Sequence, residues 1–411
     1  MRRSKLVINC QPSISPFLKK EVEDLGYKIL RAEKNGVTIE GGWQEVIDLN
    51  MNLRTASRVL WLIKSFEATN PDRLYEEAKK IPWHKIIPKD GYVSIQSYVK
   101  NDFIRDIRFA NLKLKDAIVD RMHEENGIRP DSGKERDRTV VYLYWHLNKV
   151  WVYIDTSGET IAKHGYRKIP FKAPMIEALA SACLLSAGWN DDKGSFVNPM
   201  CGSGTLAIEA AMMAAEIPPG YRRKNFGFMH INTYDPQMWE EAVAKVKIKN
   251  KIKSKIIATD WNGDAIEAAR INAKLAGVDH MIHFEKMPFE QSPIPEGPGM
   301  IILNPEYGER LGEEVLLKSV YKDIGDFFKQ SCQGKMGYIF TGNSKLAKVI
   351  GLRTKSRTEF QNAKIDCRLL EYELYDGSRR DPESRPSPKP KPAPESDTDR
   401  PVKKRPRLTR K

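Results

Sequence analysis

The 411-residue sequence predicts an α/β protein in which a C-terminal parallel sheet follows an N-terminal α+β region. Two observations point to the parallel sheet. From Lys172 onward, apolar strand patterns alternate with helical patterns, which is typical of such sheets. One of these strands leads directly into a glycine-containing turn and then a helix. A third observation defines the N-terminal region, where residues 1–160 mix half-buried strand patterns with amphipathic helices.

The N-terminal elements fall into two predicted units, residues 1–65 and residues 66–160. The first unit is expected to contain a strand at 6–10, a helix at 16–25 that Gly26 ends, a turn at 35–36 and a helix at 43–53. The second unit is expected to contain a strand at 92–98, an amphipathic helix at 111–125 and paired strands at 140–147 and 150–155.

Residues 165–376 form the third predicted unit. One helix is expected to start at Pro174 and to end before Gly188. The predicted strands lie at 196–198, 255–260, 282–284, 300–303, 337–341 and 369–375, and a further helix at 205–215. Residues 377–411 contain eight prolines and little apolar content, so a disordered basic tail is expected there.

Charge and cysteine usage narrow the class of protein. The formal net charge of +14 favours a polyanionic partner, and in 377–411 alone 12 Lys and Arg stand against 5 Asp and Glu. The five cysteines have no metal-ligand spacing, so neither a zinc site nor a disulfide framework is predicted. The apolar run at 6–8 is too short for a signal peptide, and no segment is long enough to span a bilayer. We expect a cytoplasmic protein without a bound metal.

The first chemical signal is the turn between the strand at 196–198 and the next helix. Gly202 and Gly204 carry no Cβ, so the backbone can pass close to a ligand. The helix start offers unpaired N–H groups and a partial positive charge. No Gly-Lys-Ser/Thr is present, which argues against a phosphate-binding P-loop. The candidate cofactor-binding residues of this turn are Asn198, Pro199, Met200, Gly202, Gly204 and Thr205.

The second signal is Asp260 at the end of a predicted strand, where a carboxylate can accept hydrogen bonds from ribose hydroxyls. It lies 56 residues past Gly204, whereas a dinucleotide fingerprint places its acid about 20 residues on. This spacing favours S-adenosyl-L-methionine over NAD. Trp261 is a candidate for contact with the adenine. The alternative interpretation, a tight structural turn and an exposed aspartate, becomes weak when both features precede the motif at 304–307.

The third signal is Asn-Pro-Glu-Tyr at 304–307, directly after the apolar run at 300–303. The Asn304 amide oxygen and the Pro305 carbonyl can accept hydrogen bonds from an exocyclic amine, and Tyr307 can stack on the base and hold it in position. This pattern predicts methyl transfer to nitrogen, and a base inside a helix would have to be flipped out to reach the site. The usual motif has proline where Glu306 stands. An ordinary Asn-Pro turn is the alternative.

Together these residues resemble the RlmL-type 23S rRNA guanine-N2 methyltransferases. The resemblance covers nearly all of 1–376 and includes residues 112–120, 127–130, 155–159, 164–167 and 363–369. It implies a ferredoxin-like region, a THUMP RNA-binding domain and a Rossmann-like methyltransferase that uses S-adenosyl-L-methionine. It also implies cofactor contacts at 198–205 and Asp260, and base contacts at Asn304, Pro305 and Tyr307.

The chain departs from this family at three places. Glu306 replaces the motif's second proline. The acidic residue that commonly lies near the adenine is here either Glu285 or Glu290. No second, fused methyltransferase domain is expected, because the sequence ends in a basic tail.

RNA contacts are expected on the helix at 111–125 and just after it. A candidate phosphate-facing patch consists of Lys113, Lys115, Arg121 and Arg129. Its affinity for RNA would fall as the salt concentration rises. A solvated helix face is the alternative.

The sequence thus favours a monomeric enzyme that methylates guanine N2 in 23S rRNA. A tRNA guanine-N2 methyltransferase, an adenine-N6 DNA methyltransferase and a noncatalytic RNA-binding factor for ribosome assembly remain alternatives.

Overall fold

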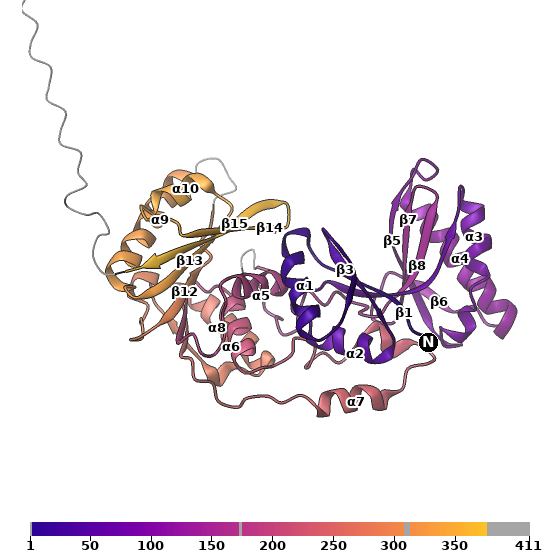
Figure 1. Ribbon diagram of the computed structural model, residues 1–411, viewed down its shortest axis with the longest axis horizontal. Coiled ribbons are helices and arrows are strands. Elements are labelled where there is room, and N and C mark those ends of the chain that lie inside the picture. Colours follow the sequence, from indigo (N-terminus) through magenta and orange to yellow (C-terminus); the bar gives the residue numbers. More distant parts are fainter. Residues whose placement is uncertain (1, 172–174, 308–312, 376–411) are drawn as a thin grey trace, which may run out of the picture. The chain divides into compact units, whose positions relative to one another are not determined.

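The computed structural model describes residues 2–171, 175–307 and 313–375, and these ranges hold two sheets (Figure 1). The first has eight strands in the order β2-β3-β1-β4-β8-β7-β5-β6. Their bounds are β1 Ser4–Asn9, β2 Ile29–Glu33, β3 Gly36–Gly41, β4 Arg58–Glu67, β5 Tyr92–Lys100, β6 Asp131–Gly133, β7 Thr139–His146 and β8 Lys149–Asp155. The strands predicted at 6–10, 92–98, 140–147 and 150–155 are all present, and β7 and β8 pair as expected.

Four helices accompany this sheet within the described residues: α1 Ser15–Asp24, α2 Trp43–Asn52, α3 Pro71–Lys79 and α4 Ile107–Asn126. Gly26 follows α1 with a φ of 84°, and Gly127 follows α4 with a φ of 70°, a conformation that glycine adopts readily at helix ends. In Figure 1, α3 and α4 lie together on one side of β5, β7 and β8.

The two predicted N-terminal units share this sheet without interruption. The predicted boundary at residue 65 falls inside β4, which pairs with β1 along one edge and with β8 along the other. The division into separate domains at this point therefore stays a prediction.

The second sheet has seven strands in the order β11-β10-β9-β12-β13-β15-β14. Their bounds are β9 Ser195–Pro199, β10 Ile256–Asp260, β11 Ile282–Lys286, β12 Gly299–Leu303, β13 Lys335–Thr341, β14 Ser356–Asn362 and β15 Ile365–Leu374. The first five in spatial order pair in parallel, and β15 runs antiparallel to both its neighbours. The chain leaves β9 toward β10 on one side and returns to β12 on the other. Such a reversal opens a crevice at the carboxyl ends of the strands, where ligands bind in open α/β sheets.

The helices described with this sheet are α5 Glu177–Ser186, α6 Thr205–Ala214, α8 Gly263–Ala276, α9 Glu313–Ser331 and α10 Ser344–Val349. Helix α7, Pro236–Ala244, packs against α2 instead. The predicted helix at 205–215 is α6. Pro174 lies outside the described residues, whereas Gly188 follows α5 with a φ of 68°, as predicted. The tail predicted at 377–411 also lies outside the described residues.

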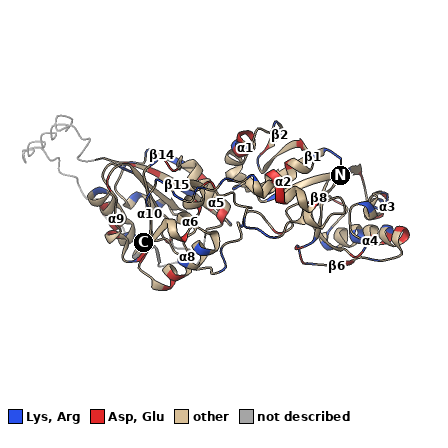
Figure 2. Ribbon diagram, turned by 90° about the horizontal axis from the view of Figure 1, so that it is seen from below, with Lys and Arg blue, Asp and Glu red and all other residues tan. Residues whose placement is uncertain are grey.

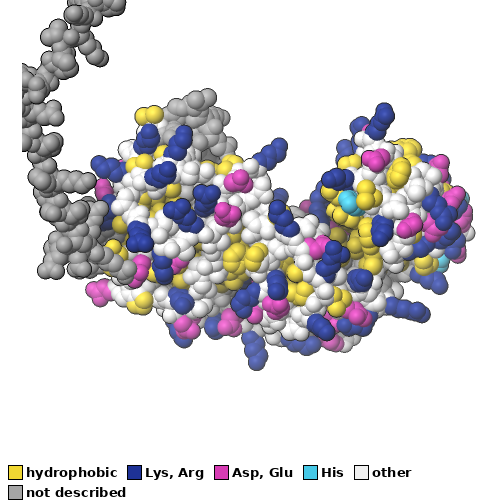
Figure 3. Space-filling view, turned by 45° about the horizontal axis from the view of Figure 1, so that its top comes forward, with side chains coloured by type: hydrophobic (Ala, Val, Ile, Leu, Met, Phe, Trp, Pro, Cys, Tyr) yellow, Lys and Arg dark blue, Asp and Glu magenta, His cyan; other side chains and the backbone are white. Residues whose placement is uncertain are grey.

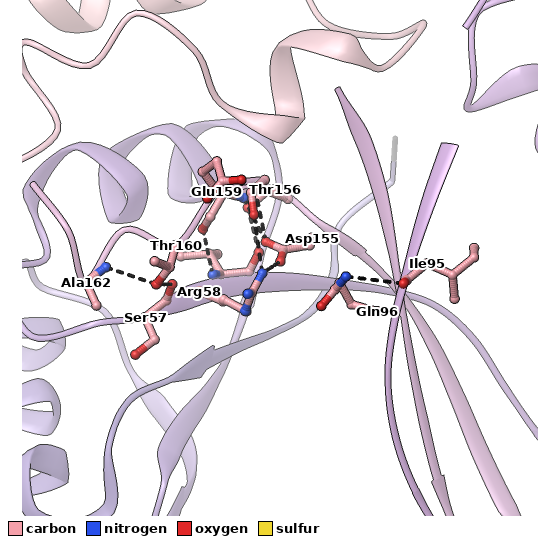
Figure 4. Close-up of polar contacts among 12 residues, drawn as sticks. Ser57, Arg58, Ile95, Gln96, Asp155, Thr156, Glu159, Thr160 and Ala162 are labelled. Carbon is pink, nitrogen blue, oxygen red and sulfur yellow. Dashed lines mark hydrogen bonds and ion pairs between the residues drawn. The ribbon is translucent and has the colours of Figure 1, made fainter. Parts of the chain in front are cut away.

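The segment that leaves the first sheet is fixed against β4 by polar contacts (Figure 4). Arg58 forms an ion pair with the buried Asp155, the last residue of β8. The Thr160 hydroxyl donates to the carbonyl of Ser57 at 3.0 Å and accepts from the N–H of Ala162 at 3.3 Å. These bonds set the direction in which the chain continues toward the second sheet.

A buried histidine then joins the first region to α6. His164 Nδ1 lies 2.7 Å from Glu209 Oε1, and its Nε2 lies 3.0 Å from the carbonyl oxygen of Arg54. Both partners are acceptors, so the ring satisfies both only as an imidazolium. Burial opposes this charge, but the Glu209 carboxylate outweighs it and raises the pKa of His164. Ser181 donates to the other oxygen of Glu209 at 2.8 Å.

We predict that this pair makes stability depend on pH. Because the folded pKa of His164 lies above its unfolded value of about 6.5, its contribution is complete below that pH and is lost as pH rises through the folded pKa. At pH 6, His164→Gln should lower the free energy of unfolding by about 3 kcal/mol. Urea denaturation between pH 6 and 9 should show the gap to wild type narrowing with pH. A constant gap would contradict the assigned protonation.

The ranges that the structure describes include all five cysteines. All five cysteines are free thiols. No group of three His, Cys, Asp or Glu side chains in these ranges is placed to hold a metal ion. None of the helices described has the length and apolar character needed to cross a bilayer.

Candidate active site

The turn after β9 is held in place by the neighbouring strand β10. The Cys201 N–H donates to the Thr259 carbonyl at 2.9 Å, and the Gly202 N–H donates to Asp260 Oδ2 at 2.9 Å. Met200, Gly202 and Gly204 have φ values of 59°, 55° and 84°. The backbone therefore turns sharply before α6 begins at Thr205, and the first N–H groups of this helix face the crevice.

Asp260 links the turns that follow β9 and β10. It is buried, with 8% of its surface exposed, and its Oδ1 accepts from the Asn262 N–H at 2.9 Å. Each carboxylate oxygen has a further lone pair beyond these backbone bonds. The side chain is thus rigid and can still accept hydrogen bonds from the two hydroxyls of a ribose.

A cavity of about 500 Å³ lies at this edge of the sheet, a size suited to a small-molecule cofactor. Its walls are residues 260–262, 288–290, 304–306 and all of 198–206 except Pro199 and Gly204. Phe171, Met175, Leu317 and Val320 complete it from other segments. The cavity therefore joins the predicted cofactor residues Asn198, Met200, Gly202, Thr205, Asp260 and Trp261 to the motif residues Asn304 and Pro305.

Two predicted cofactor residues do not line the cavity. Pro199 is the last residue of β9 and is buried in the sheet. A Cβ on Gly204 would lie 2.9 Å from the Cβ of Ala269 in α8. The absence of a side chain at Gly204 therefore serves the packing of two helices, and its role in letting a ligand approach stays a prediction.

The close contact between Gly204 and Ala269 leads to a stability prediction. Gly204→Ala combines an unfavourable positive φ with a steric conflict at Ala269, so we expect it to lower the free energy of unfolding by about 2–3 kcal/mol. Gly202→Ala is the matched control, because it has a positive φ but nothing within 4 Å of the added Cβ; its loss should be about 1 kcal/mol. Urea midpoints measure both, and equal losses would contradict the packing role.

The motif after β12 holds a buried amide oxygen in Asn304, a residue that lines the cavity. Asn304 Oδ1 is buried and has no hydrogen-bond partner among the described residues. Asn198 Oδ1 is also buried and has no hydrogen-bond partner among the described residues. The Nδ2 of Asn198 donates to the Ile302 carbonyl at 2.8 Å. Buried polar atoms are nearly always paired, so two unpaired acceptors in one cavity indicate a ligand with donors.

Tyr307 does not line the cavity. Its hydroxyl accepts from Asn362 Nδ2 at 2.9 Å, and Asn343 Nδ2 donates to its carbonyl at 3.3 Å. The ring lies against Gly342, where a Cβ would approach it to 3.2 Å. The Asn362 and Gly342 contacts hold the ring toward β13 and β14, away from the cofactor side. Its role in stacking on a base stays a prediction.

The structure places the two candidate acids, Glu285 and Glu290, differently with respect to the cavity. Glu290 lines the cavity, whereas Glu285 lies on β11 with an oxygen 3.1 Å from His283 Nε2. The sequence analysis did not single out Pro288 and Phe289, which also line the cavity. Their position directly after β11 is a sequence signal that could have identified them. No local sequence pattern points to the remaining lining residues, because only the fold brings them to the cavity. These residues are Phe171, Met175, Leu317 and Val320.

The four cations predicted to face RNA all have acidic neighbours. The pairs are Lys113–Asp72 at 2.7 Å, Lys115–Asp116 at 3.0 Å, Arg121–Glu125 at 2.7 Å and Arg129–Asp120 at 2.9 Å. Figure 2 shows both charge signs on α4. The phosphate-facing patch stays a prediction, and these ion pairs weaken it because each cation is locally balanced.

The sheet order, the glycine turn and the buried acid at the end of β10 place the C-terminal region in the class of S-adenosyl-L-methionine-dependent methyltransferases. Family models agree with this class and refine it. Residues 164–371 match the RMKL-like methyltransferase domain, residues 5–60 the RlmL ferredoxin-like domain and residues 68–155 the THUMP domain. The chain belongs to the RMKL-like methyltransferase family.

Individual relatives agree with this assignment. Ribosomal RNA large subunit methyltransferase K/L of Syntrophotalea carbinolica is 34% identical over 381 residues, which cover 90% of this chain and 53% of the relative. The chain thus spans about half the length of that protein. Putative RNA methyltransferase slr0064 of Synechocystis is 32% identical and aligns over 87% of this chain and 93% of its own. A possible methylase from Clostridium difficile superposes with a TM-score of 0.81 and 29% identity, over 92% of this chain and 100% of that one.

Proposed function

We propose that this protein transfers a methyl group from S-adenosyl-L-methionine to the exocyclic N2 of a guanine in 23S ribosomal RNA. The observation that carries the proposal is the buried, unpaired Oδ1 of Asn304 in the wall of the cofactor cavity. The THUMP match and the names of the relatives support RNA, and ribosomal RNA in particular, as the substrate. The choice of guanine N2 rests on the family resemblance of the motifs.

The unpaired acceptor fits an amino group on a planar base. Burying such an oxygen without a partner costs about 1–3 kcal/mol, and a bound amine would remove that cost. The lone pair of the amine is delocalised into the ring, which makes the nitrogen a weak nucleophile. Two acceptors, Asn304 Oδ1 and the Pro305 carbonyl, would hold its N–H bonds and turn the lone pair toward the cofactor.

The other side of the cavity fits the cofactor. Asp260 would accept the ribose hydroxyls, the N–H groups at the start of α6 would face the methionine carboxylate, and Glu290 would lie near the adenine. When bound, S-adenosyl-L-methionine supplies a methyl group already activated by its sulfonium. The amine held by Asn304 and Pro305 would accept this methyl group in place of one proton, which would pass to water. The chain's own contribution is to place the two groups in line.

Three alternatives differ in substrate or in turnover. Guanine N2 in tRNA would use the same residues. Adenine N6 in DNA would use the same motif but leaves the THUMP match unexplained. A noncatalytic RNA-binding factor for ribosome assembly is suggested by Glu306, which lines the cavity where the usual motif has proline. Calorimetry with the cofactor followed by a turnover assay separates such a factor from an enzyme.

The proposal is tested with methyl-labelled cofactor and, in separate reactions, undermodified ribosomal RNA and undermodified tRNA. After digestion to nucleosides, the label should be found in N2-methylguanosine. Label in another nucleoside would exclude guanine N2, and label in tRNA alone would favour the first alternative.

A further inference from the structure

One face of the first sheet has aromatic side chains that no helix covers. α3 and α4 pack on the opposite face of β5, β7 and β8 (Figure 1), where Leu143, Trp145 and Val150 are fully buried. Side chains alternate along a strand, so the residues between these point to the other side. Among them, Tyr98 is 44% exposed, and Tyr144 and Trp151 are half-buried.

The strand register places these three rings in one row. Tyr98 of β5 is aligned with Tyr144 of β7, and Tyr144 is aligned with Trp151 of β8. The two tyrosine rings are stacked at a centroid distance of 5.2 Å with 13° between their planes, and Tyr144 meets Trp151 edge-on at 5.6 Å. We call Tyr98, Tyr144 and Trp151 the aromatic row. It crosses three strands, so its position is fixed by the sheet.

The next row on the same face is basic. The same register aligns Lys100, His146 and Lys149, and both lysines are exposed. In the part of the chain that the structure describes, neither lysine has a carboxylate within ion-pair distance, in contrast to the four cations at α4. Acidic groups nearby are Glu67, which ends this row, and Glu33, which pairs with Arg31 at 2.8 Å. The face therefore combines exposed rings with uncompensated positive charge.

We propose that this face binds single-stranded RNA, with bases on the aromatic row and phosphates near Lys100 and Lys149. The proposal rests on the proposed function, which identifies the bound polymer as RNA. It adds the surface to which the RNA binds and the single-stranded form in which it binds. Unpaired bases stack on aromatic side chains irrespective of sequence, whereas a duplex keeps its base faces covered. Figure 3 shows exposed hydrophobic side chains lying among Lys and Arg side chains on the visible surface. An uncharged apolar peptide would gain nothing from the lysines, so a polyanion with flat rings fits the face best.

The test is fluorescence anisotropy of labelled RNA with the full-length chain. The probes are oligouridylate and oligoadenylate of about ten nucleotides, a length that one such surface spans, with a duplex of equal length and oligothymidylate for comparison. The variants are Tyr98→Ala, Tyr144→Ala and the pair Lys100→Gln with Lys149→Gln. Tyr98→Phe keeps the ring, and Lys19→Gln with Lys20→Gln removes two paired cations on α1. Circular dichroism and thermal melting verify that each variant folds.

Each alanine variant should weaken single-strand binding by roughly tenfold or more, while Tyr98→Phe and the α1 variant stay within about twofold of wild type. The double lysine variant should reduce the slope of log affinity against log salt by about 1.4. Unchanged single-strand binding in both folded alanine variants would overturn the proposal, as would tighter binding of the duplex. Equal binding of oligothymidylate would extend the site to DNA and refute a preference for RNA. Because these assays involve no methyl transfer, they can succeed or fail independently of the proposed function.

Discussion

Asn304→Ala should reduce the rate of methyl transfer at least about 100-fold and leave cofactor affinity within about twofold of wild type. The reason is the position of Asn304 Oδ1, which is buried, unpaired and part of the cavity wall after β12. Alanine removes an acceptor that the amine needs and touches none of the groups around Asp260. Single-turnover rates with saturating RNA measure the first effect, and calorimetry with S-adenosylhomocysteine measures the second.

Asn304→Asp is the matched control for this change. It keeps an acceptor oxygen of the same reach, so it should retain more activity than the alanine variant. A wild-type rate for Asn304→Ala would refute the role of the amide. A parallel loss of cofactor affinity would show that the side chain supports the cavity and does not orient the base.

Asp260→Asn should weaken cofactor binding by about 10- to 100-fold. The two carboxylate oxygens accept from the N–H groups of Gly202 and Asn262 at 2.9 Å each. An asparagine offers one oxygen only, so its NH₂ would face one of these donors or one of the ribose hydroxyls. The turn after β9 would lose an anchor at the same time as the cofactor loses an acceptor. Calorimetry with S-adenosylhomocysteine gives the dissociation constant.

Asp264→Asn serves as the control for this second prediction. Asp264 lies in the first turn of α8, is exposed and does not line the cavity. Its substitution should leave the dissociation constant unchanged. Equal effects of the two substitutions would point to a general loss of negative charge near the cofactor, and no effect of Asp260→Asn would remove the ribose-binding role.

The second sheet could be predicted because its central strands are short, apolar and separated by helical patterns. β14 was missed because Ser356–Asn362 is a polar edge strand with one buried apolar residue, Phe360. The continuity of the first sheet was also missed. It depends on the pairing of β4 with β8, whose residues are far apart in the sequence, and no local pattern reports it.

The candidate site was predictable where its residues follow strands directly. The residues of 198–205, Asp260 and 304–305 lie at strand ends, so a parallel sheet necessarily brings them to one edge. The contacts of Tyr307 could not be predicted, because Gly342 and Asn362 come from later in the chain. The ion pair between Lys113 and Asp72 could not be predicted for a similar reason, since Asp72 lies on a different helix.

The most direct test of the central claim is mass-spectrometric mapping of ribosomal and transfer RNA from cells with and without this protein. The proposed function predicts that one N2-methylguanosine of 23S rRNA is lost when the protein is absent and returns with the wild-type chain but not with Asn304→Ala. An unchanged set of N2-methylguanosines in 23S rRNA would contradict it.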